Sequence, residues 1–455
     1  MLTLSKPKKI AIVGGGIAGL GCAYLLHPHH TVTVFEAAHY LGGHSNTVTT
    51  QSISGSDIPI DTGFMVYNPE TYPHLMHLFT QLGVTGVPTD MSFSVQHDAA
   101  GWGGRSLEWA GGSLSQLFAQ KRNLLNPKFW QLLLTLNRFN EDAIEAMRTG
   151  SADTLTLGEY CQRQNYPSVV LDWFLLPMSA AIWSTDPEKM RDFPARTLLR
   201  FFVNHRFVGM GNHVQWLTVA GGSQSYVAKI KDTLQQSATA STYLKAPIKQ
   251  VKRNEQEPGV TLILENGETH DFDQVILACH ADTARQLLKD PTALEQALLD
   301  PFAYEANVAT LHTDETVMPS RKNAWAAWNY GLHANQASTH YWMNRLQHLP
   351  DTREGGNTYI VSINGEALVR PERVIQTVSY SHPRFTLASI KAQKELVQLN
   401  RQSDERVFFA GSYFRYGFHE DAFGSAIQLC RHLLGNDCWP VLSDASGSPD
   451  WTMVT

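Results

Sequence analysis

The N-terminal segment has a pattern of apolar positions that predicts two short strands joined by a helix. Residues 10–13 are an uninterrupted apolar run, which is typical of a parallel strand buried on both faces. An Ala- and Leu-rich stretch with the composition of a buried helix follows. Residues 31–35 are β-branched or aromatic, which favours a second strand. This order predicts a βαβ unit with parallel strands.

Later segments show both strand and helix patterns. Strands are expected in five runs: 248–253, 260–264, 275–278, 358–363 and 406–411. Helical periodicity extends over 114–147, broken by Pro127, and a last helix is expected at 422–434. The mixture predicts an α/β fold. No apolar stretch reaches the roughly 18 residues that a transmembrane helix needs.

A glycine-rich turn joins the first predicted strand to its helix. The glycines follow G-x-G-x-x-G spacing, which allows a tight turn, close approach of a pyrophosphate and close helix–strand packing. We expect the phosphates at the turn and the helix start: Gly14, Gly15, Gly16, Ile17, Ala18 and Gly19. Glu36, about 20 residues on, ends the second strand, where a carboxylate can accept hydrogen bonds from ribose hydroxyls. The motif predicts NAD or FAD and disfavours NADP.

Segments spread over the whole chain resemble the flavin-containing amine oxidase and phytoene desaturase superfamily. They are Leu41-Gly42-Gly43-His44, Ile60-Asp61-Thr62-Gly63, Val219-Ala220-Gly221-Gly222-Ser223, the RVFFAG run ending at Gly411, and Phe418-His419-Glu420-Asp421. The resemblance implies FAD as the cofactor. Where this superfamily attaches FAD covalently it uses a cysteine upstream of the late glycine, and none lies between Cys279 and Gly411. FAD is therefore expected to bind non-covalently.

The same resemblance assigns further residues to FAD. It places Gly42, Gly43 and His44 by the pyrophosphate, Gly411 and Ser412 by the ribityl chain, and Asp421, Ala422 and Phe423 by the flavin. The chain departs from the superfamily pattern in two places. Tyr40 and His44 stand where arginines usually flank the Gly-Gly turn, and Ser412 stands where an acidic residue is common.

A closer resemblance is to bacterial flavoproteins predicted to bind NAD or FAD and often encoded beside cyclopropane-fatty-acid synthases. It is carried by residues 180–184, 325–330, 341–347, 380–383 and 416–421. This likeness implies lipid chemistry by association.

The positions of these segments predict a discontinuous, Rossmann-like FAD-binding domain formed by 6–90, 215–292 and 396–438. The insertions 91–214 and 293–395 would together form an α+β substrate domain. Residues 440–455, rich in Ser, Asp and Gly, are expected to be a peripheral tail.

Candidate catalytic residues are aromatic side chains and a histidine, because chemistry at a flavin belongs mostly to the cofactor. Trp325, Trp328 and Tyr330 are expected to line the substrate pocket, with Trp183 opposite; simple core packing is the alternative for each. We take Trp328, Tyr330 and His419 as candidate catalytic residues. His419 could polarise the flavin or move a proton, or it could order the turn around it.

Asp421 is expected to be the N-cap of the last helix, directing the N–H groups of Ala422 and Phe423 toward the flavin. His280 and His382 are expected to be structural. No metal-ligand cluster or nucleophile elbow is present in the sequence.

Composition and charge exclude other classes of function. A formal net charge of −6 provides no general attraction to nucleic acid. The cysteines are scattered and odd in number: Cys22, Cys161, Cys279, Cys430 and Cys438. This pattern is typical of reduced thiols, so a cytoplasmic location is expected.

Three functions stay open at this point. They are an FAD-dependent oxidoreductase that oxidises, desaturates or isomerises an apolar, lipid-like substrate by hydride transfer, an amine oxidase, and a non-catalytic FAD-bearing partner of a lipid-modifying enzyme. Lys322 is the nearest lysine for an amine oxidase, in a context that does not match. Residues 200–208 have two possible interpretations: a basic, apolar surface that contacts a membrane, or a buried helix. The electron acceptor and the oligomeric state are undetermined.

Overall fold

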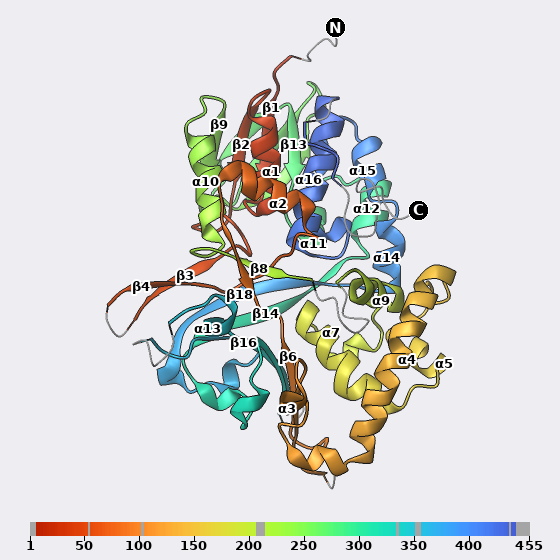
Figure 1. The fold of residues 1–455 in the computed structure, drawn as a ribbon. Helices are drawn as coiled ribbons and strands as arrows, with labels where there is room; N and C mark the ends of the chain where they lie inside the picture. The colour runs from red at the N-terminus through yellow and green to blue at the C-terminus, as the bar shows by residue number, and fades with distance from the viewer. Residues whose placement is uncertain are drawn as a thin grey trace.

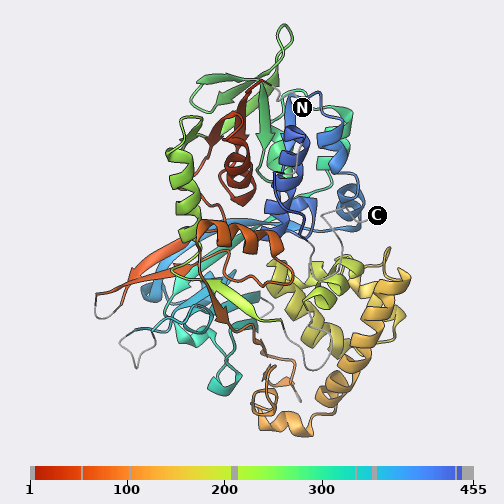
Figure 2. The ribbon, with the colours of Figure 1, turned by 45° about the horizontal axis from the view of Figure 1, so that its top comes forward.

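The computed structural model describes residues 6–52, 55–101, 104–205, 214–333, 336–350, 356–435 and 438–442. Its upper part in Figure 1 contains a parallel sheet covered by helices, and its lower part contains a larger mixed sheet beside a helical unit. Both views show the helical unit standing beside the mixed sheet (Figures 1 and 2). The domain boundaries inferred from the sequence stay a prediction, and most of the expected tail, 443–455, lies outside the described residues.

The parallel sheet is the frame of the expected nucleotide site. Its strands, in spatial order, are β19 (Val407–Phe409), β13 (Gln274–Leu277), β1 (Lys9–Val13), β2 (Thr31–Phe35) and β9 (Ala240–Tyr243). All neighbouring pairs are parallel. Side chains alternate between two cores, because successive residues of a strand point to opposite faces. Ile10 and Ile12 pack on one face, and Ala11 and Val13 pack on the other.

Helices cover both faces of this sheet. One face carries α1 (Ile17–Leu26), α2 (Pro73–Leu82), α10 (Gln224–Gln235) and α16 (His419–Leu434). The other carries α11 (Ala281–Leu287), α12 (Ala293–Leu299), α14 (Leu387–Gln393), α15 (Val397–Arg401) and the antiparallel strands β10 (Ile248–Arg253), β11 (Val260–Leu264) and β12 (Thr269–Phe272). Helix coverage on both faces explains why the strand residues of β1 and β13 are apolar without alternation.

The mixed sheet begins with two long antiparallel strands near the middle of the molecule. Its order is β18 (Val374–Arg384), β14 (Ala303–His312), β17 (Ile360–Ile363), β16 (Gln336–Trp342), β15 (Trp328–His333), β6 (Phe93–His97) and β7 (Leu107–Ala110). Only β15 and β6 pair in parallel within the described sheet. Two antiparallel pairs complete the strands: β3 (Thr47–Gln51) with β4 (Asp57–Asp61), and β5 (Gly86–Thr89) with β8 (Trp216–Val219).

The helical unit packs its apolar side chains against β6, β7 and β15. It contains α3 (Leu114–Leu117), η2 (Lys121–Leu125), α4 (Pro127–Thr149), α5 (Leu157–Arg163), α6 (Ser168–Val170), η3 (Leu171–Leu175), α7 (Leu176–Trp183), α8 (Pro187–Met190) and α9 (Ala195–Asn204). The break expected at Pro127 is the start of α4, because proline fits the first turn, where no intrahelical acceptor is needed. No described helix is both long and apolar enough to cross a membrane.

Helix α9 bears on the two alternatives that the sequence left open for residues 200–208. Phe201 and Phe202 are buried in the core of the helical unit, and the guanidinium of Arg200 donates to the hydroxyl of Tyr416. The described part of this segment is therefore a buried helix, because its apolar face packs against the other helices and does not face solvent. Residues 206–208, which completed the expected membrane-contacting surface, lie outside the described residues.

The remaining short elements connect the larger ones. They are η4 (Glu315–Val317), η5 (Lys322–Ala324), α13 (Met343–Leu346), η7 (Glu366–Leu368), η8 (Pro371–Arg373) and η9 (Ser412–Phe414).

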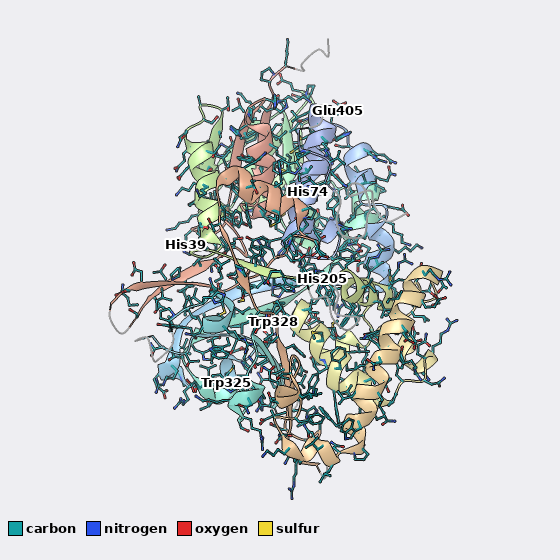
Figure 3. The ribbon with its side chains drawn as sticks, viewed as in Figure 1. His39, His74, His205, Trp325, Trp328 and Glu405 are labelled. Atoms are coloured by element: carbon teal, nitrogen blue, oxygen red, sulfur yellow. The ribbon has the colours of Figure 1, made fainter. Side chains whose placement is uncertain are left out.

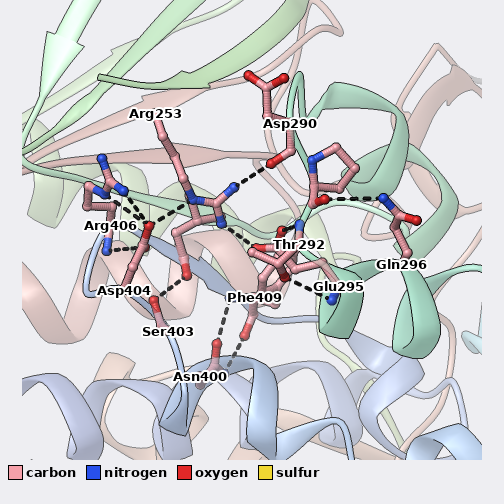
Figure 4. A network of polar contacts seen from close by, with 12 residues as sticks. Arg253, Asp290, Thr292, Glu295, Gln296, Asn400, Ser403, Asp404, Arg406 and Phe409 are labelled. Atoms are coloured by element: carbon pink, nitrogen blue, oxygen red, sulfur yellow. Dashed lines mark hydrogen bonds and ion pairs between the residues drawn. The ribbon is translucent and has the colours of Figure 1, made fainter. Parts of the chain in front are cut away.

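A polar network holds the strand that leads to Gly411 (Figure 4). The guanidinium of Arg253 on β10 pairs with the buried Glu295 and donates to Asp404 at 3.0 Å. The side-chain amide of Asn400 brackets Phe409 of β19, accepting from its N–H at 2.8 Å and donating to its carbonyl at 2.9 Å. These bonds fix the last residues before the turn at Gly411, because they join β19 to the neighbouring helix and strand.

Candidate active site

A cavity of about 640 Å³ extends from the glycine-rich turn of the parallel sheet to the wall formed by α7 and β15. Residues from both parts of the molecule line it, from Gly14 and Glu36 at one end to Met178 and Trp328 at the other. Of the described residues that line the cavity, none is lysine or arginine, and Glu36 is the one acidic residue. Lys322 lies elsewhere, exposed and paired with Glu315.

The glycines of the turn are required for different physical reasons. Gly14 has φ +110°, and a Cβ there would lie 2.7 Å from the carbonyl oxygen of Ala278. A Cβ on Gly19 would lie 1.9 Å from the carbonyl oxygen of Gly14, so this glycine allows helix α1 to pack on the turn. A Cβ on Gly16 would meet no atom within 4 Å. Gly16 therefore leaves space inside the cavity, whereas the other two satisfy the packing of the protein itself.

The carboxylate of Glu36 is fixed by the backbone beside the turn. One oxygen accepts from the N–H of Gly15 at 2.6 Å, and the other accepts from the N–H of Ala38 at 2.7 Å. A carboxylate has about four acceptor positions, so both oxygens can still accept from ligand hydroxyls. Its place at the end of β2 matches the position expected for recognition of a ribose.

Three histidines face the cavity beside the glycine-rich turn. The ring of His44 lies 5.1 Å from that of His382 and 6.5 Å from that of His280, and it stacks on Tyr380 at 4.7 Å. Burial is the main cause that lowers the pKa of each imidazole, to about 4 for His382 and well below the usual value for His44. The Nε2 of His44 and the Nδ1 of His382 are buried without a hydrogen-bond partner. This histidine cluster, His44, His280 and His382, is therefore uncharged at neutral pH and has unused polar atoms.

The start of α16 differs from the sequence-based expectation. Asp421 is the third residue of the helix rather than its N-cap, and its carboxylate accepts from the N–H groups of Tyr416 and Phe418. The N–H of Ala422 donates to the carbonyl of Phe418 and is not directed at a ligand. The helix begins three residues earlier than predicted, because Phe418 is its N-cap.

His419 lies at the cavity between two neighbours. Its Nε2 hydrogen-bonds the hydroxyl of Ser45 at 2.8 Å, and its ring stacks on Phe64 at 3.9 Å. Burial lowers the pKa of His419 to about 3, so the imidazole is neutral between pH 5 and 8. The neutral ring can order the turn or polarise a ligand, but it is poorly suited to deliver a proton at neutral pH.

An aromatic wall closes the other end of the cavity. Trp328 on β15 packs edge-on against Tyr341 on β16, with their ring centroids 4.8 Å apart. Trp183 and Met178 on α7 line the same cavity. The indole Nε1 of Trp328 is buried and has no hydrogen-bond partner. Trp183 and Trp328, two of the residues expected at the substrate pocket, thus line this cavity.

Trp325 and Tyr330 do not line the cavity. The indole N–H of Trp325 donates to the carbonyl of Pro319, and its ring packs on Trp342 in a separate apolar cluster. Figure 3 shows Trp328 nearer the middle of the molecule than Trp325. Tyr330 shares the strand face of Trp328, but it lies two residues farther into the core of the helical unit. Both are core side chains, which was the alternative reading of each.

Most of the residues expected to hold the cofactor line the cavity. These are Gly14, Gly16, Ile17, Ala18, Glu36, Gly42, Gly43, His44, Gly411, Ser412 and Ala422. Gly15, Gly19, Asp421 and Phe423 support the turn or the last helix from behind. Two further histidines, His280 and His382, line the cavity, although the sequence indicated a structural role for both. Their only sequence signal is position, since His280 lies shortly after β13 and His382 lies near the end of β18.

A family model described as flavin containing amine oxidoreductase matches residues 17–367 of the chain. The 15-cis-phytoene desaturase of Arabidopsis thaliana is 24% identical over 306 residues, which cover 63% of this chain and 50% of that protein. The same enzyme of Glycine max is 25% identical over 297 residues, with the same shares. The chain thus spans about half the length of the curated relatives it matches.

Solved structures of similar fold cover almost the whole chain. Cyclohexylamine oxidase from Brevibacterium oxydans IH-35A superposes with a TM-score of 0.64 and 17% identity, over 94% of this chain and 99% of that one. A CLA-producing fatty acid isomerase from P. acnes superposes with a TM-score of 0.64 and 14% identity, over the same shares. At these identities the likeness shows the fold alone.

Proposed function

We propose that this protein, which belongs to the flavin containing amine oxidoreductase family, is an FAD-dependent oxidoreductase that acts on an apolar, fatty-acyl-like substrate. FAD is the cofactor indicated by membership of this family. The assignment from sequence to this superfamily, with an α/β fold, is confirmed. The substrate and the roles of individual residues are the proposed part.

The residues that line the cavity fit FAD. Gly16 leaves open space at the start of α1, where the helix N-terminus favours a phosphate. Glu36 is fixed to accept from the adenosine ribose, and the histidine cluster has unused polar atoms beside the turn. We propose that Gly14, Gly16, Gly43 and His44 hold the pyrophosphate. When bound, FAD supplies the acceptor for a hydride, at flavin N5.

The observation that carries the substrate proposal is the absence of ionised side chains from the aromatic end of the cavity. Of the described residues there, the lining is mainly aromatic and aliphatic, with side chains such as Met178, Trp183, Trp328, Tyr341 and Ile363. A charged substrate would lose its hydration here without gaining a partner, which is costly. An apolar chain gains the full benefit of burial.

The wall residues would act by position rather than by chemistry. Trp328 and Tyr341 form an edge-on pair whose faces can confine a flat or extended chain, and Trp183 with Met178 closes the opposite side. Such a wall excludes water and orients the carbon that loses a hydride. The phytoene desaturase relatives and the fatty acid isomerase are named for reactions on such apolar molecules.

Amine oxidation is the alternative, since cyclohexylamine oxidase and putrescine oxidase share the fold. Ring faces such as those of Trp328 and Tyr341 could receive a nitrogen. Deprotonating an ammonium requires a base, and apart from Glu36, which the backbone N–H groups of Gly15 and Ala38 hold at the glycine-rich turn, the described lining provides histidines. Burial makes these imidazoles weak bases, since it lowers the pKa of His382 to about 4 and that of His419 to about 3. The apolar substrate is therefore favoured.

Replacing Trp328 by alanine is expected to slow turnover while FAD stays bound. The indole forms one wall of the cavity far from the glycine-rich turn, so its loss removes substrate confinement only. We expect kcat/KM to fall by roughly 10- to 100-fold, or about 1.4–2.7 kcal/mol. The measurement is the rate of anaerobic flavin bleaching by oleic acid or an oleoyl phospholipid, beside the FAD content of the protein.

Trp328→Phe is the matched control, because it keeps an aromatic wall, and it is expected to retain most of the activity. Rapid bleaching by cyclohexylamine or putrescine, with none by any acyl lipid, would instead establish amine oxidation. Loss of FAD from Trp328→Ala would show that the wall supports the cofactor rather than the substrate.

A further inference from the structure

The lower end of the helical unit exposes several large apolar side chains. Leu114 on α3, Leu125 on η2 and Leu134 on α4 are 76%, 74% and 71% exposed. Leu124 and Trp130, between them in the chain, are also exposed. The segment from α3 to the first turns of α4 forms the lower end of the molecule in both ribbon views (Figures 1 and 2), and we call the surface of these five side chains the apolar tip.

The apolar tip is ordered rather than loose. Asn126 caps α4 by accepting from the N–H of Lys128, and the indole N–H of Trp130 donates to the carbonyl of Leu124 at 2.8 Å. Phe118 packs on Trp130 and on the buried Phe129 beneath it, with ring centroids 5.6 and 5.8 Å away. The exposed side chains of the tip thus project from a packed layer beneath them.

The chain segment that carries the apolar tip has charges of one sign. Residues 111–140 contain four basic residues, Lys121, Arg122, Lys128 and Arg138, and no aspartate or glutamate, in a chain of net charge −6. Lys121 and Lys128 are exposed and make no ion pair within the described part of the chain. Arg122 donates to the carbonyl of Ser106, and Arg138 pairs with Asp142. The two lysines therefore flank the exposed leucines with unneutralised charge.

We propose that the apolar tip docks on an anionic phospholipid bilayer, with Leu114, Leu125 and Leu134 in the interfacial region and Lys121 and Lys128 at the phosphates. Leucine and tryptophan beside lysine is the composition that binds the boundary between headgroups and acyl chains. Anionic lipids complement the local charge, whereas the rest of the molecule, being acidic overall, does not attract them. A protruding end suits a bilayer, because insertion into the headgroup region does not require a complementary groove, as docking on a protein partner would.

Docking through the apolar tip would place the cavity wall near the membrane source of an apolar molecule. Helix α4 of the tip and helix α7 of the cavity wall share one apolar core, which includes Phe129, Met178 and Trp183. The docking surface itself does not depend on the proposed function, because it rests on exposure and charge alone.

The test is co-sedimentation of the FAD-loaded protein with vesicles of phosphatidylcholine alone or mixed equally with phosphatidylglycerol. Wild-type protein is expected to bind the anionic vesicles at least tenfold better than the neutral ones, and less at high salt. Lys121→Glu/Lys128→Glu and Leu125→Gln/Leu134→Gln should each reduce binding to anionic vesicles at least tenfold. Circular dichroism and FAD content establish that both variants fold.

Matched controls change exposed side chains of the same kind, lysine and aliphatic, on other parts of the surface. Lys229→Glu/Lys231→Glu alters two exposed lysines on α10, and Val374→Gln/Ile375→Gln alters two exposed apolar residues on β18. Both should bind anionic vesicles like wild type. Absence of wild-type binding, or equal loss in the controls, would overturn the proposal. So would self-association in sedimentation velocity that the tip variants abolish, since the surface would then serve a second copy of the chain.

Discussion

Purified Gly16→Leu protein is expected to fold and to contain no FAD, whereas wild-type protein is expected to be yellow and to release FAD on denaturation. Gly16 has φ −74° and ψ −179°, a conformation that leucine can adopt. A Cβ at this position meets nothing within 4 Å, so the side chain would extend into the cavity. It would occupy the place proposed for the pyrophosphate, and we expect binding to weaken at least 100-fold, or about 2.7 kcal/mol.

The effect on folding should be small by comparison. Gly16 is the N-cap of α1 and makes no side-chain cap bond, so an apolar residue there is expected to cost roughly 1 kcal/mol of unfolding free energy. The measurements are the flavin absorption of the purified protein, the Kd for added FAD, and the thermal unfolding midpoint.

Gly19→Ala supplies the contrast within the same motif. Its Cβ would lie 1.9 Å from the carbonyl oxygen of Gly14, so the turn or the helix must move. This variant is expected to lose stability and FAD together. Stoichiometric FAD in folded Gly16→Leu protein would show that the pyrophosphate does not bind at this turn.

The βαβ unit could be predicted from the sequence because its determinants are local. The apolar run of β1, the glycine spacing and Glu36 lie within one short segment, and each residue contacts its neighbours in the chain or the adjacent strand. The backbone clash that excludes a side chain at Gly19 involves Gly14 in the same turn. Such short-range constraints fix the spacing of these residues, so the motif can be recognised in the sequence alone.

The aromatic wall was only partly predictable, because composition does not determine which face of a strand reaches a cavity. Trp325 and Trp328 lie three residues apart, yet a 3₁₀ turn directs Trp325 to the cluster with Val317 and Trp342. Tyr330 keeps the strand face of Trp328 but lies where the helices cover it. Depth along a strand depends on the packing of distant elements, which the local pattern does not record.

The histidine cluster could not be predicted for the same reason. His44, His280 and His382 come from three segments that meet only in the fold, one after the Gly-Gly turn, one after β13 and one near the end of β18. The sequence showed that His44 replaces an arginine common in the superfamily. It did not show that two further imidazoles lie beside His44 in the fold.

FAD is expected to bind more tightly as the pH is lowered from 8 toward 5, with uptake of protons by the histidine cluster. No lysine or arginine is among the described residues that line the cavity, so imidazoles are the groups there that can become cationic beside a diphosphate. In the free protein burial lowers their pKa, to about 4 for His382, and they are neutral at pH 7. A bound dianion raises these pKa values, because it favours the charged form.

The sign follows from linkage. A group whose pKa is higher in the complex than in the free protein takes up a proton on binding. The affinity for FAD therefore rises as the pH falls from the pKa in the complex to the pKa in the free protein. Each linked proton changes Kd by up to about tenfold per pH unit. Three neighbours of the cluster do not titrate in this range: burial raises the pKa of Tyr380 to about 12 and that of Tyr304 further, and lowers that of His419 to about 3.

Binding to the FAD-free protein, followed by quenching of FAD fluorescence at each pH, measures this dependence, and calorimetry in buffers of different ionisation enthalpy counts the protons. His44→Arg supplies a fixed charge and should bind FAD more tightly at pH 8, with a shallower pH dependence. His382→Gln keeps a polar side chain but cannot become charged, so it should weaken binding at pH 6 more than at pH 8. A Kd that is constant between pH 6 and 8 in the wild type, or proton release on binding, would exclude a cationic role for the cluster and leave the helix N-terminus of α1 as the main source of attraction for the phosphates.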